Sequence, residues 1–379
     1  MPSGGRRLGF RLRVLSRAAW ALARSAGRRA RPAAPERILV AHHLLLGDTL
    51  MLTPLLAKLR ERHPAADIAM TTPRGIAPIY RGSPYGVRAL AYDTRDASTF
   101  DAAEAARGFD LAYVPADNRF SWLAAAYGAR WIVAFAGDRP AYKSWSVDES
   151  RPYRATPAAL GDLTADLVDG PPPRPYRPED WPDPEAAPFD APVDASVHAS
   201  AARYAVLHVG ASTPLKLWDR EKWRSLAAFL EARGLHVVWS GGRGEEGEVA
   251  AIDPERRRPS YAGKLDLAQM WHLLKRASLL VSPDTGIAHL GRIVNVPTVT
   301  LFGPGSALVC GAGEFWRSSP YRAVTIPDFP CRDQRELFKR EIAWLKHCTR
   351  GPHECAAPRC MQAIEVAPVA AAIEELLGR

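Results

Sequence analysis

Residues 277–289 read ASLLVSPDTGIAH. The apolar run that ends at Val281 predicts a buried parallel strand, and the apolar residues after Gly286 predict the start of a helix. The turn Asp284-Thr285-Gly286 therefore stands at the carboxyl end of a strand and the amino end of a helix. Backbone N–H groups and the helix dipole favour an anion such as a diphosphate there, although the same residues would equally serve as a helix cap.

The same strand-and-turn plan recurs along the chain. Further strands are expected at 37–42, 204–209, 235–239 and 298–301. Their turns read LGDT at 46–49, GASTPLK at 210–216, GGRGEE at 241–246 and FGP at 302–304. Open α/β sheets bind ligands at the carboxyl ends of their strands, so these turns are the candidate ligand sites.

The length of 379 residues predicts two domains rather than one core. In the first half, strands at 37–42, 67–72, 110–114 and 130–135 alternate with helices, as in a doubly wound α/β domain. Proline is dense from Pro171 to Pro192, which predicts a linker or an irregular crossover. The expected divisions are a basic arm (1–35), an N-terminal domain with the crossover (36–190), a C-terminal domain (198–361) and a last helix (362–379).

This ordered set of turns resembles glycosyltransferase family 9, the heptosyltransferase family of lipopolysaccharide assembly, over about residues 37 to 375. The resemblance implies an α/β fold of the GT-B architecture, with two Rossmann-like doubly wound domains facing an interdomain cleft. It implies that the C-terminal domain holds a nucleotide-sugar and that the N-terminal domain holds the acceptor. It also implies that the helix at 366–377 crosses back onto the first domain.

Asp48 is the candidate general base. A sugar hydroxyl is a poor nucleophile and must lose its proton as it attacks. In the resembled family the Asp of the matching turn, here Gly47-Asp48, has this role; a helix N-cap is the alternative. His42 and His43 stand where the family usually has polar residues that position the acceptor, so we expect both, with Gly47, on the acceptor side.

Lys216 is the candidate that offsets the charge of the leaving nucleoside diphosphate, and it stands three residues after Thr213. The hydroxyls of Ser212 and Thr213 can donate to phosphate oxygens. The resemblance places a ribose-binding carboxylate in the glycine-rich turn, where Glu245 is the nearer match and Glu246 remains an alternative. An exposed lysine and a plain turn are the ordinary interpretations.

The remaining donor-side residues follow the opening stretch. Backbone groups of Thr285 and Gly286 are expected on the phosphates and Asp284 on sugar hydroxyls. The resemblance places His289 near the donor phosphates, whereas a lone histidine on an apolar helix is more often packed in a core. Leu265 aligns with a position that touches adenine in some members, and plain packing explains it equally well.

Charge is concentrated in residues 1–35. The net charge is +9, and this segment holds nine Arg and no acidic residue, so the remainder is formally neutral. Arginines alternate there with Phe10, Leu12, Leu15 and Trp20, which suits a helix on an anionic membrane surface, while a solvated arm or an early start codon are the alternatives. No membrane span and no nucleic-acid module are predicted. We expect a cytoplasmic protein, peripheral at the inner face of the inner membrane.

All five cysteines lie beyond residue 309. Free thiols, a disulfide and a metal site stay open from their spacing. No Asp-x-Asp arrangement is present to hold a catalytic divalent ion, so catalysis without metal or cofactor is expected, with the nucleotide-sugar as substrate.

Together with Asp48, Lys216 and Asp284, the resemblance implies an inverting glycosyltransferase, with heptose from ADP-heptose as donor and a lipid-linked or lipopolysaccharide glycan as acceptor. The alternatives are a transferase that uses another nucleotide-sugar for O-antigen or capsule, and a non-catalytic membrane-surface protein that keeps the fold.

Overall fold

The structure is a computed structural model that describes residues 3–25, 29–104, 107–190 and 203–378. The chain forms two compact units. The first unit comprises Met1–Arg174, Glu179–Pro182 and Arg335–Leu345, and the second comprises Pro175–Pro178, Asp183–Gln334 and Lys346–Arg379.

The first unit is built on a six-stranded parallel sheet of order β3-β2-β1-β4-β5-β6. Its strands are β1 (Arg37–Val40), β2 (Asp67–Thr72), β3 (Val87–Ala91), β4 (Leu111–Val114), β5 (Trp131–Phe135) and β6 (Glu149–Arg151). Its helices are α1 (Ser3–Ser25), α2 (Leu46–Leu50), α3 (Thr53–Arg62), α4 (Ala97–Glu104), α5 (Phe120–Ala126) and α6 (Leu160–Ala165). The order reverses between β1 and β4, and doubly wound sheets bind ligands at such a switch point.

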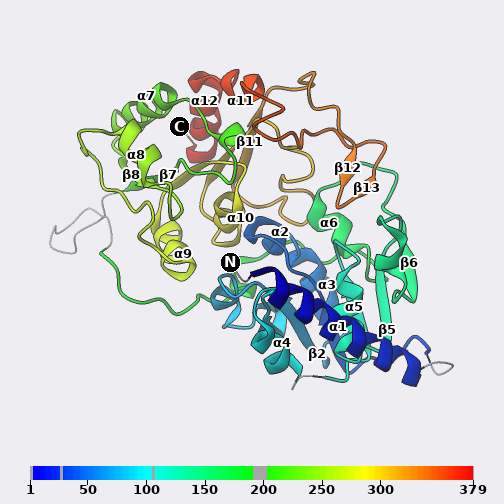
Figure 1. Cartoon of the computed structure of the whole chain (residues 1–379). Helices are drawn as coiled ribbons and strands as arrows, with labels where there is room; N and C mark the ends of the chain where they lie inside the picture. The colour runs from blue at the N-terminus through cyan, green and yellow to red at the C-terminus, as the bar shows by residue number, and fades with distance from the viewer. Residues whose placement is uncertain (1–2, 26–28, 105–106, 191–202, 379) are drawn as a thin grey trace. The chain divides into compact units, whose positions relative to one another are not determined.

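Helix α1 is packed against this unit instead of extending from it as an arm. It lies along α5 (Figure 1), and its Phe10, Val14 and Ala18 are buried in the hydrophobic core. The ring of Phe10 contacts those of Tyr92 and Phe100 at centroid distances of 6.1 and 6.0 Å. Part of the expected arm, residues 1–2 and 26–28, lies outside the described residues.

The second unit is built on a five-stranded parallel sheet of order β11-β10-β9-β7-β8. Its strands are β7 (Tyr204–His208), β8 (His236–Ser240), β9 (Leu279–Pro283), β10 (Thr298–Phe302) and β11 (Tyr321–Thr325). Its helices are α7 (Arg220–Glu231), α8 (Glu246–Ile252), α9 (Leu267–Arg276), α10 (Gly286–Ile293), α11 (Arg359–Gln362) and α12 (Val366–Leu377), with a single 3₁₀ turn, η5 (Pro214–Lys216). The switch point of this sheet lies between β7 and β9, which pair directly.

The last helix differs from its expected position. α12 belongs to the second unit, where Val369 and Ile373 are buried in the core with the strands of the second sheet. Lys222 of α7 holds the segment before it, donating to the Ile364 carbonyl at 3.0 Å and pairing with Glu365 at 2.8 Å. The apolar spacing of the helix identified a buried face, but carried no information about which sheet it would cover.

The unit boundaries also depart from the expected ones. Residues 183–190 lie in the second unit, and Arg335–Leu345 returns to the first, where β12 (Glu336–Leu337) and β13 (Arg340–Glu341) pair as a short antiparallel hairpin. The expected start of the second domain, residue 198, lies in the segment 191–202, outside the described residues. Across the described part of the chain, no helix is long and apolar enough to cross a membrane.

Candidate functional site

The switch point of the second sheet brings together two residues that are 68 positions apart, Lys216 and Asp284. Lys216 follows β7 and Asp284 follows β9. The ammonium Nζ donates to the main-chain oxygen and to Oδ2 of Asp284, both at 2.8 Å. The side chain of Asp284 is 8% exposed and that of Lys216 is 24% exposed. The Lys216 ammonium, paired with a carboxylate, is therefore held at the strand ends where open α/β sheets in general bind ligands.

His289 lies behind this pair on α10 and is buried. Its Nδ1 contacts Arg292 Nη2, which can only donate, so the imidazole proton is assigned to Nε2. Nε2 is 4.0 Å from Asp284 Oδ1. Burial, and then the charges of Arg292 and Lys216, lower the pKa of His289 well below its usual value, which keeps the ring neutral. The core and donor-side interpretations of His289 both agree with this geometry.

Arg292 was not anticipated from the sequence. It is 2% exposed, it donates to the Cys310 carbonyl at 3.1 Å, and its guanidinium lies over the rings of Trp316 and Tyr321 at 4.9 and 5.0 Å. Its place three residues after His289, on the same helix face, was the only local signal.

The amino end of α10 carries Thr285 and Gly286. Thr285 occupies the N-cap position, but its side chain makes no capping hydrogen bond to the helix. Its Oγ1 instead lies 3.1 Å from Ser282 Oγ. Next to this turn the main chain of Gly305 packs on the carboxylate, because a Cβ there would lie 2.4 Å from Asp284 Oδ2. The capping interpretation therefore finds no side-chain cap from Thr285.

Glu245 folds back over the end of β7. Its carboxylate accepts from the Gly242 N–H, and a Cβ added to Gly210 would lie only 1.6 Å from its Oε2. Glu246 turns elsewhere, since it accepts from the Gly244 N–H at 3.1 Å and lies against Gly263. Of the two carboxylates in the glycine-rich turn, the one beside the switch point is Glu245.

The three remaining donor-side candidates are less constrained. Thr213 Oγ1 caps η5 by accepting from the Leu215 N–H at 3.4 Å. Ser212 is exposed, and Leu265 is half-buried in the loop before α9.

The acceptor-side candidates lie at the carboxyl end of β1. His42 is fully buried, and its Nδ1 accepts from the Leu44 N–H at 3.2 Å. Burial, assisted by His43, lowers the pKa of His42 to about 3, so it is neutral with its proton on Nε2. That Nε2 has no hydrogen-bond partner among the residues described. The ring of His43 stacks on Phe120 at a centroid distance of 6.5 Å.

Gly47 and Asp48 lie inside α2, which begins at Leu46. Asp48 is therefore in the first turn of the helix and is not its N-cap, as the alternative interpretation had it; the N-cap position is held by Leu45. The amino end of a helix favours a negative charge, so the ionised carboxylate suits this position.

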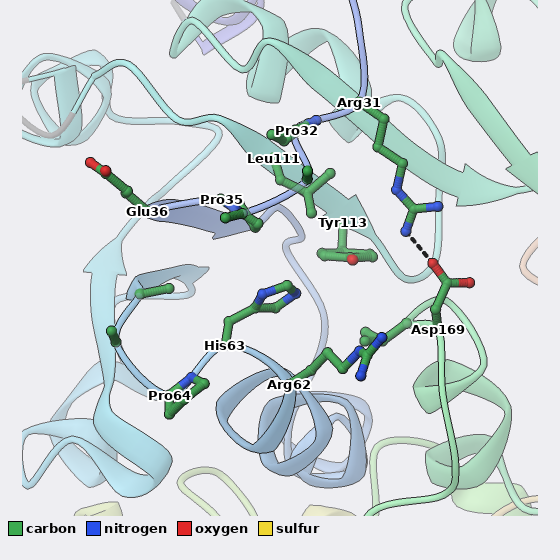
Figure 2. A pocket seen from close by; sticks show the side chains of 15 residues that line it. Arg31, Pro32, Pro35, Glu36, Arg62, His63, Pro64, Leu111, Tyr113 and Asp169 are labelled. Carbon is green, nitrogen blue, oxygen red and sulfur yellow. Dashed lines mark hydrogen bonds and ion pairs between the residues drawn. The ribbon is translucent and has the colours of Figure 1, made fainter.

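A separate cavity of about 600 Å³ opens at the amino ends of the strands of the first sheet (Figure 2). The acceptor-side candidates lie at the carboxyl ends of the same sheet. Its lining comes from residues that precede or begin β1, β2 and β4, among them Glu36, Ala66 and Leu111. Arg31 pairs with Asp169 on one side of it, as the dashed line in Figure 2 marks. The cavity lies at the amino ends of the strands, away from His42 and Asp48, and none of the predicted site residues lines it.

All five cysteines carry thiols and none forms a disulfide. Burial, with Cys331 as the next contribution, raises the pKa of the Cys360 thiol to about 11. Among the residues that the structure describes, no group of three or more His, Cys, Asp or Glu side chains is arranged to hold a metal ion.

Comparison with known proteins identifies the family. The model of glycosyltransferase family 9 (heptosyltransferase) matches residues 117–323, more than half of the chain. Lipopolysaccharide heptosyltransferase 3 of Escherichia coli is 24% identical over 327 residues, covering 76% of this chain and 90% of that protein. E. coli ADP-heptose lps heptosyltransferase II shares the fold with a TM-score of 0.64 at 18% identity, over 90% of this chain and 98% of that one. E. coli heptosyltransferase WaaC with ADP gives 0.59 at 18% identity, over 76% and 92%. Each of the two α/β units of this chain is built on a parallel sheet, as in the GT-B fold class. This chain is a glycosyltransferase that belongs to family 9, the heptosyltransferase family.

Proposed function

We propose that the chain is an inverting, metal-independent heptosyltransferase that moves heptose from ADP-heptose onto a lipopolysaccharide or other surface-glycan acceptor. The second unit would bind the donor and the first unit the acceptor. Support for this choice comes from the similar lipopolysaccharide heptosyltransferase 3 and from the similar fold of WaaC, which was solved with ADP.

The observation that carries the proposal is the Lys216–Asp284 pair at the switch point of the second sheet. Its geometry fixes the ammonium before any ligand arrives, so no reorganisation is needed as negative charge builds on the leaving diphosphate. The amino end of α10 adds the favourable end of a helix dipole. In this scheme Glu245, beside Gly210, accepts hydrogen bonds from the ribose hydroxyls.

The transfer itself is a single displacement. The acceptor oxygen bonds to the anomeric carbon as the bond from that carbon to the diphosphate oxygen breaks, and ADP leaves with the electron pair. Asp48 takes the hydroxyl proton as general base. Attack from the face opposite the leaving group inverts the configuration at the anomeric carbon.

Contact with an anionic membrane surface is the third element of the proposal. α1 buries Phe10, Val14 and Ala18, while Leu12, Leu15 and Trp20 are 57%, 42% and 54% exposed. The guanidinium of Arg24 lies over the Trp20 ring at 4.6 Å. A helix that presents apolar side chains among arginines suits the interface of an anionic bilayer.

The test is calorimetry with ADP, UDP, GDP, CMP and dTDP, with and without EDTA. We expect selective ADP binding that survives EDTA and weakens about 10- to 150-fold in Lys216→Ala, because hydrogen bonds to charged groups contribute about 1.5–3 kcal/mol. Lys346→Ala, whose side chain is 65% exposed in the same unit, is the matched control and should bind as wild type. Asp48→Asn should bind ADP normally but lose about 10²–10⁴ in kcat.

Three other outcomes of this experiment would change the proposed function. Preference for a different base would indicate another nucleotide-sugar, for O-antigen or capsule. Loss of ADP binding in EDTA would contradict a metal-independent donor site. No nucleotide binding by wild type would contradict the transferase and favour a non-catalytic membrane-surface protein.

A further inference from the structure

Two aromatic side chains stand exposed after β5. Tyr142 is 52% exposed and Trp145 is 74% exposed, and their rings form an edge-to-face pair with centroids 6.5 Å apart. They lie on and directly after a single 3₁₀ turn, η3 (Ala141–Ser144). Large apolar side chains held together in solvent mark binding surfaces more often than solitary ones do.

The backbone beneath these rings is fixed by buried polar groups. Lys143, between the two aromatics, is buried, and its Nζ pairs with Asp138 Oδ1 at 3.0 Å and Asp117 Oδ1 at 3.1 Å. Hydrogen bonds also hold the turn from α5 and the loop before it: Ser121 Oγ to the Lys143 carbonyl (2.9 Å), Trp122 Nε1 to the Tyr142 carbonyl (3.0 Å) and Asn118 Nδ2 to Ser144 Oγ (2.8 Å).

Arg340 completes this network from the returning segment Arg335–Leu345. Its guanidinium is buried and donates to Asn118 Oδ1 at 2.6 Å, to the Ala136 carbonyl at 3.0 Å and to Asp138 Oδ2 at 3.4 Å. Two cations thus compensate the carboxylates under the turn. A binding surface held in this way is pre-organised, so little conformational entropy is lost when a ligand binds to it.

The aromatic pair lies on the side of the first sheet where its strands have their carboxyl ends, which is also the side of the predicted acceptor residues. The turns after β1, β4 and β5 stand side by side at the carboxyl ends of neighbouring strands. His43, after β1, stacks on Phe120, and the exposed guanidinium of Arg119 lies 5.9 Å from the same ring. Arg119 also pairs with Asp117, which binds Lys143. A continuous path of contacts therefore joins the predicted acceptor residue His43 to the turn that carries Tyr142 and Trp145.

We propose that the Trp145 ring, supported edge-to-face by Tyr142, forms a platform on which a sugar ring of the acceptor glycan stacks. One face of a pyranose ring presents C–H groups that pack on an aromatic face, while its hydroxyls stay in water. Arg119, with a side chain 59% exposed, flanks the platform and suits a carboxylate or phosphate on that sugar. The proposal rests on the proposed function in one respect, namely that the acceptor is a surface glycan.

The test is direct binding of a deacylated lipopolysaccharide core oligosaccharide, measured by calorimetry without donor. Trp145→Ala should weaken binding about tenfold, and Trp145→Phe, which keeps a ring, should retain most of the affinity. Arg130→Ala is the control, because its side chain is 71% exposed in the same unit and lies at the other end of β5. ADP binding should be unchanged in all three variants, and in turnover the loss should fall on the acceptor KM.

Three results would overturn the platform. They are wild-type affinity in Trp145→Ala, an equal loss in Arg130→Ala, and no oligosaccharide binding by the wild type. A loss seen only with acylated acceptor in vesicles would assign the rings to lipid and would also contradict the proposal. Because the assay needs no donor, failure of the transferase proposal registers separately, as absence of nucleotide binding.

Discussion

Replacing Gly210 with alanine should weaken nucleotide binding while leaving the protein folded. The added Cβ would lie 1.6 Å from Glu245 Oε2, 2.3 Å from its Cδ and 2.8 Å from its Oε1. Ordinary contact needs about 3.5 Å or more, so the carboxylate must retreat by about 2 Å. A carboxylate displaced that far can no longer accept both ribose hydroxyls.

Gly210→Ala should change the free energy of ADP binding more than the free energy of unfolding. Losing charge-assisted hydrogen bonds to the ribose would cost about 1.5–3 kcal/mol, or roughly 10- to 150-fold in the Kd for ADP. Stability should change by less than about 1 kcal/mol. The carboxylate loses its bond to the Gly242 N–H, whereas alanine reduces the entropy of the unfolded chain by a similar amount.

Calorimetry with ADP and urea unfolding would measure both quantities. Gly247→Ala is the control, since a Cβ there meets nothing within 4 Å. In the Glu245→Ala background, Gly210→Ala should cause no further loss, because the clash acts through the carboxylate. Full ADP affinity in Gly210→Ala, or additive losses in the double variant, would refute this role for Glu245.

Further variants test a buried ion pair, two buried histidines and the exposed face of α1. Arg340→Ala should lower the free energy of unfolding by about 3–5 kcal/mol, because it leaves a buried carboxylate short of a partner, and urea unfolding should show no comparable loss for the exposed neighbour Lys339→Ala. Acid should destabilise the protein: burial lowers the folded-state pKa of His42 to about 3 and of His208 to about 4, against about 6.5 unfolded, so the unfolded chain binds more protons as pH falls below 6.5. Each costs about 2 kcal/mol at pH 5, and a His208→Gln variant that kept the full pH dependence would contradict this. Leu12→Glu should reduce co-sedimentation with vesicles containing phosphatidylserine, and equal binding to pure phosphatidylcholine would argue against the anionic surface.

Local pattern was sufficient to predict most strands. Those at 67–72, 130–135 and 298–301 coincide with β2, β5 and β10 to within a residue, and each of these strands is buried along nearly its whole length. β3, β6 and β11 were missed, and each is an edge strand of its sheet with partly exposed residues, such as Arg88 in β3. Their apolar signal is weak because helices do not cover them fully.

The candidate site residues were predicted from the sequence one at a time, and their arrangement in space was not predicted. Lys216 and Asp284 were each assigned to the donor, yet their ion pair joins turns after different strands and has no local signature. Arg292 and Arg340 were not predicted at all, because their side chains are buried against segments that are distant in the sequence. The assignments of donor, acceptor and base remain predictions that the experiments above address.

The returning segment Arg335–Leu345 also bears on how the chain folds during synthesis. Arg340 is 202 residues later than Asp138, so at 5–20 residues per second the ribosome needs about 10 to 40 s to supply it. Until then the nascent first unit has Asp138 and Lys143 in place but lacks the guanidinium that binds Asn118. Its final packing must therefore wait until nearly the whole polypeptide has been made, and cutting the gene at the proline-rich crossover would yield an incomplete N-terminal half.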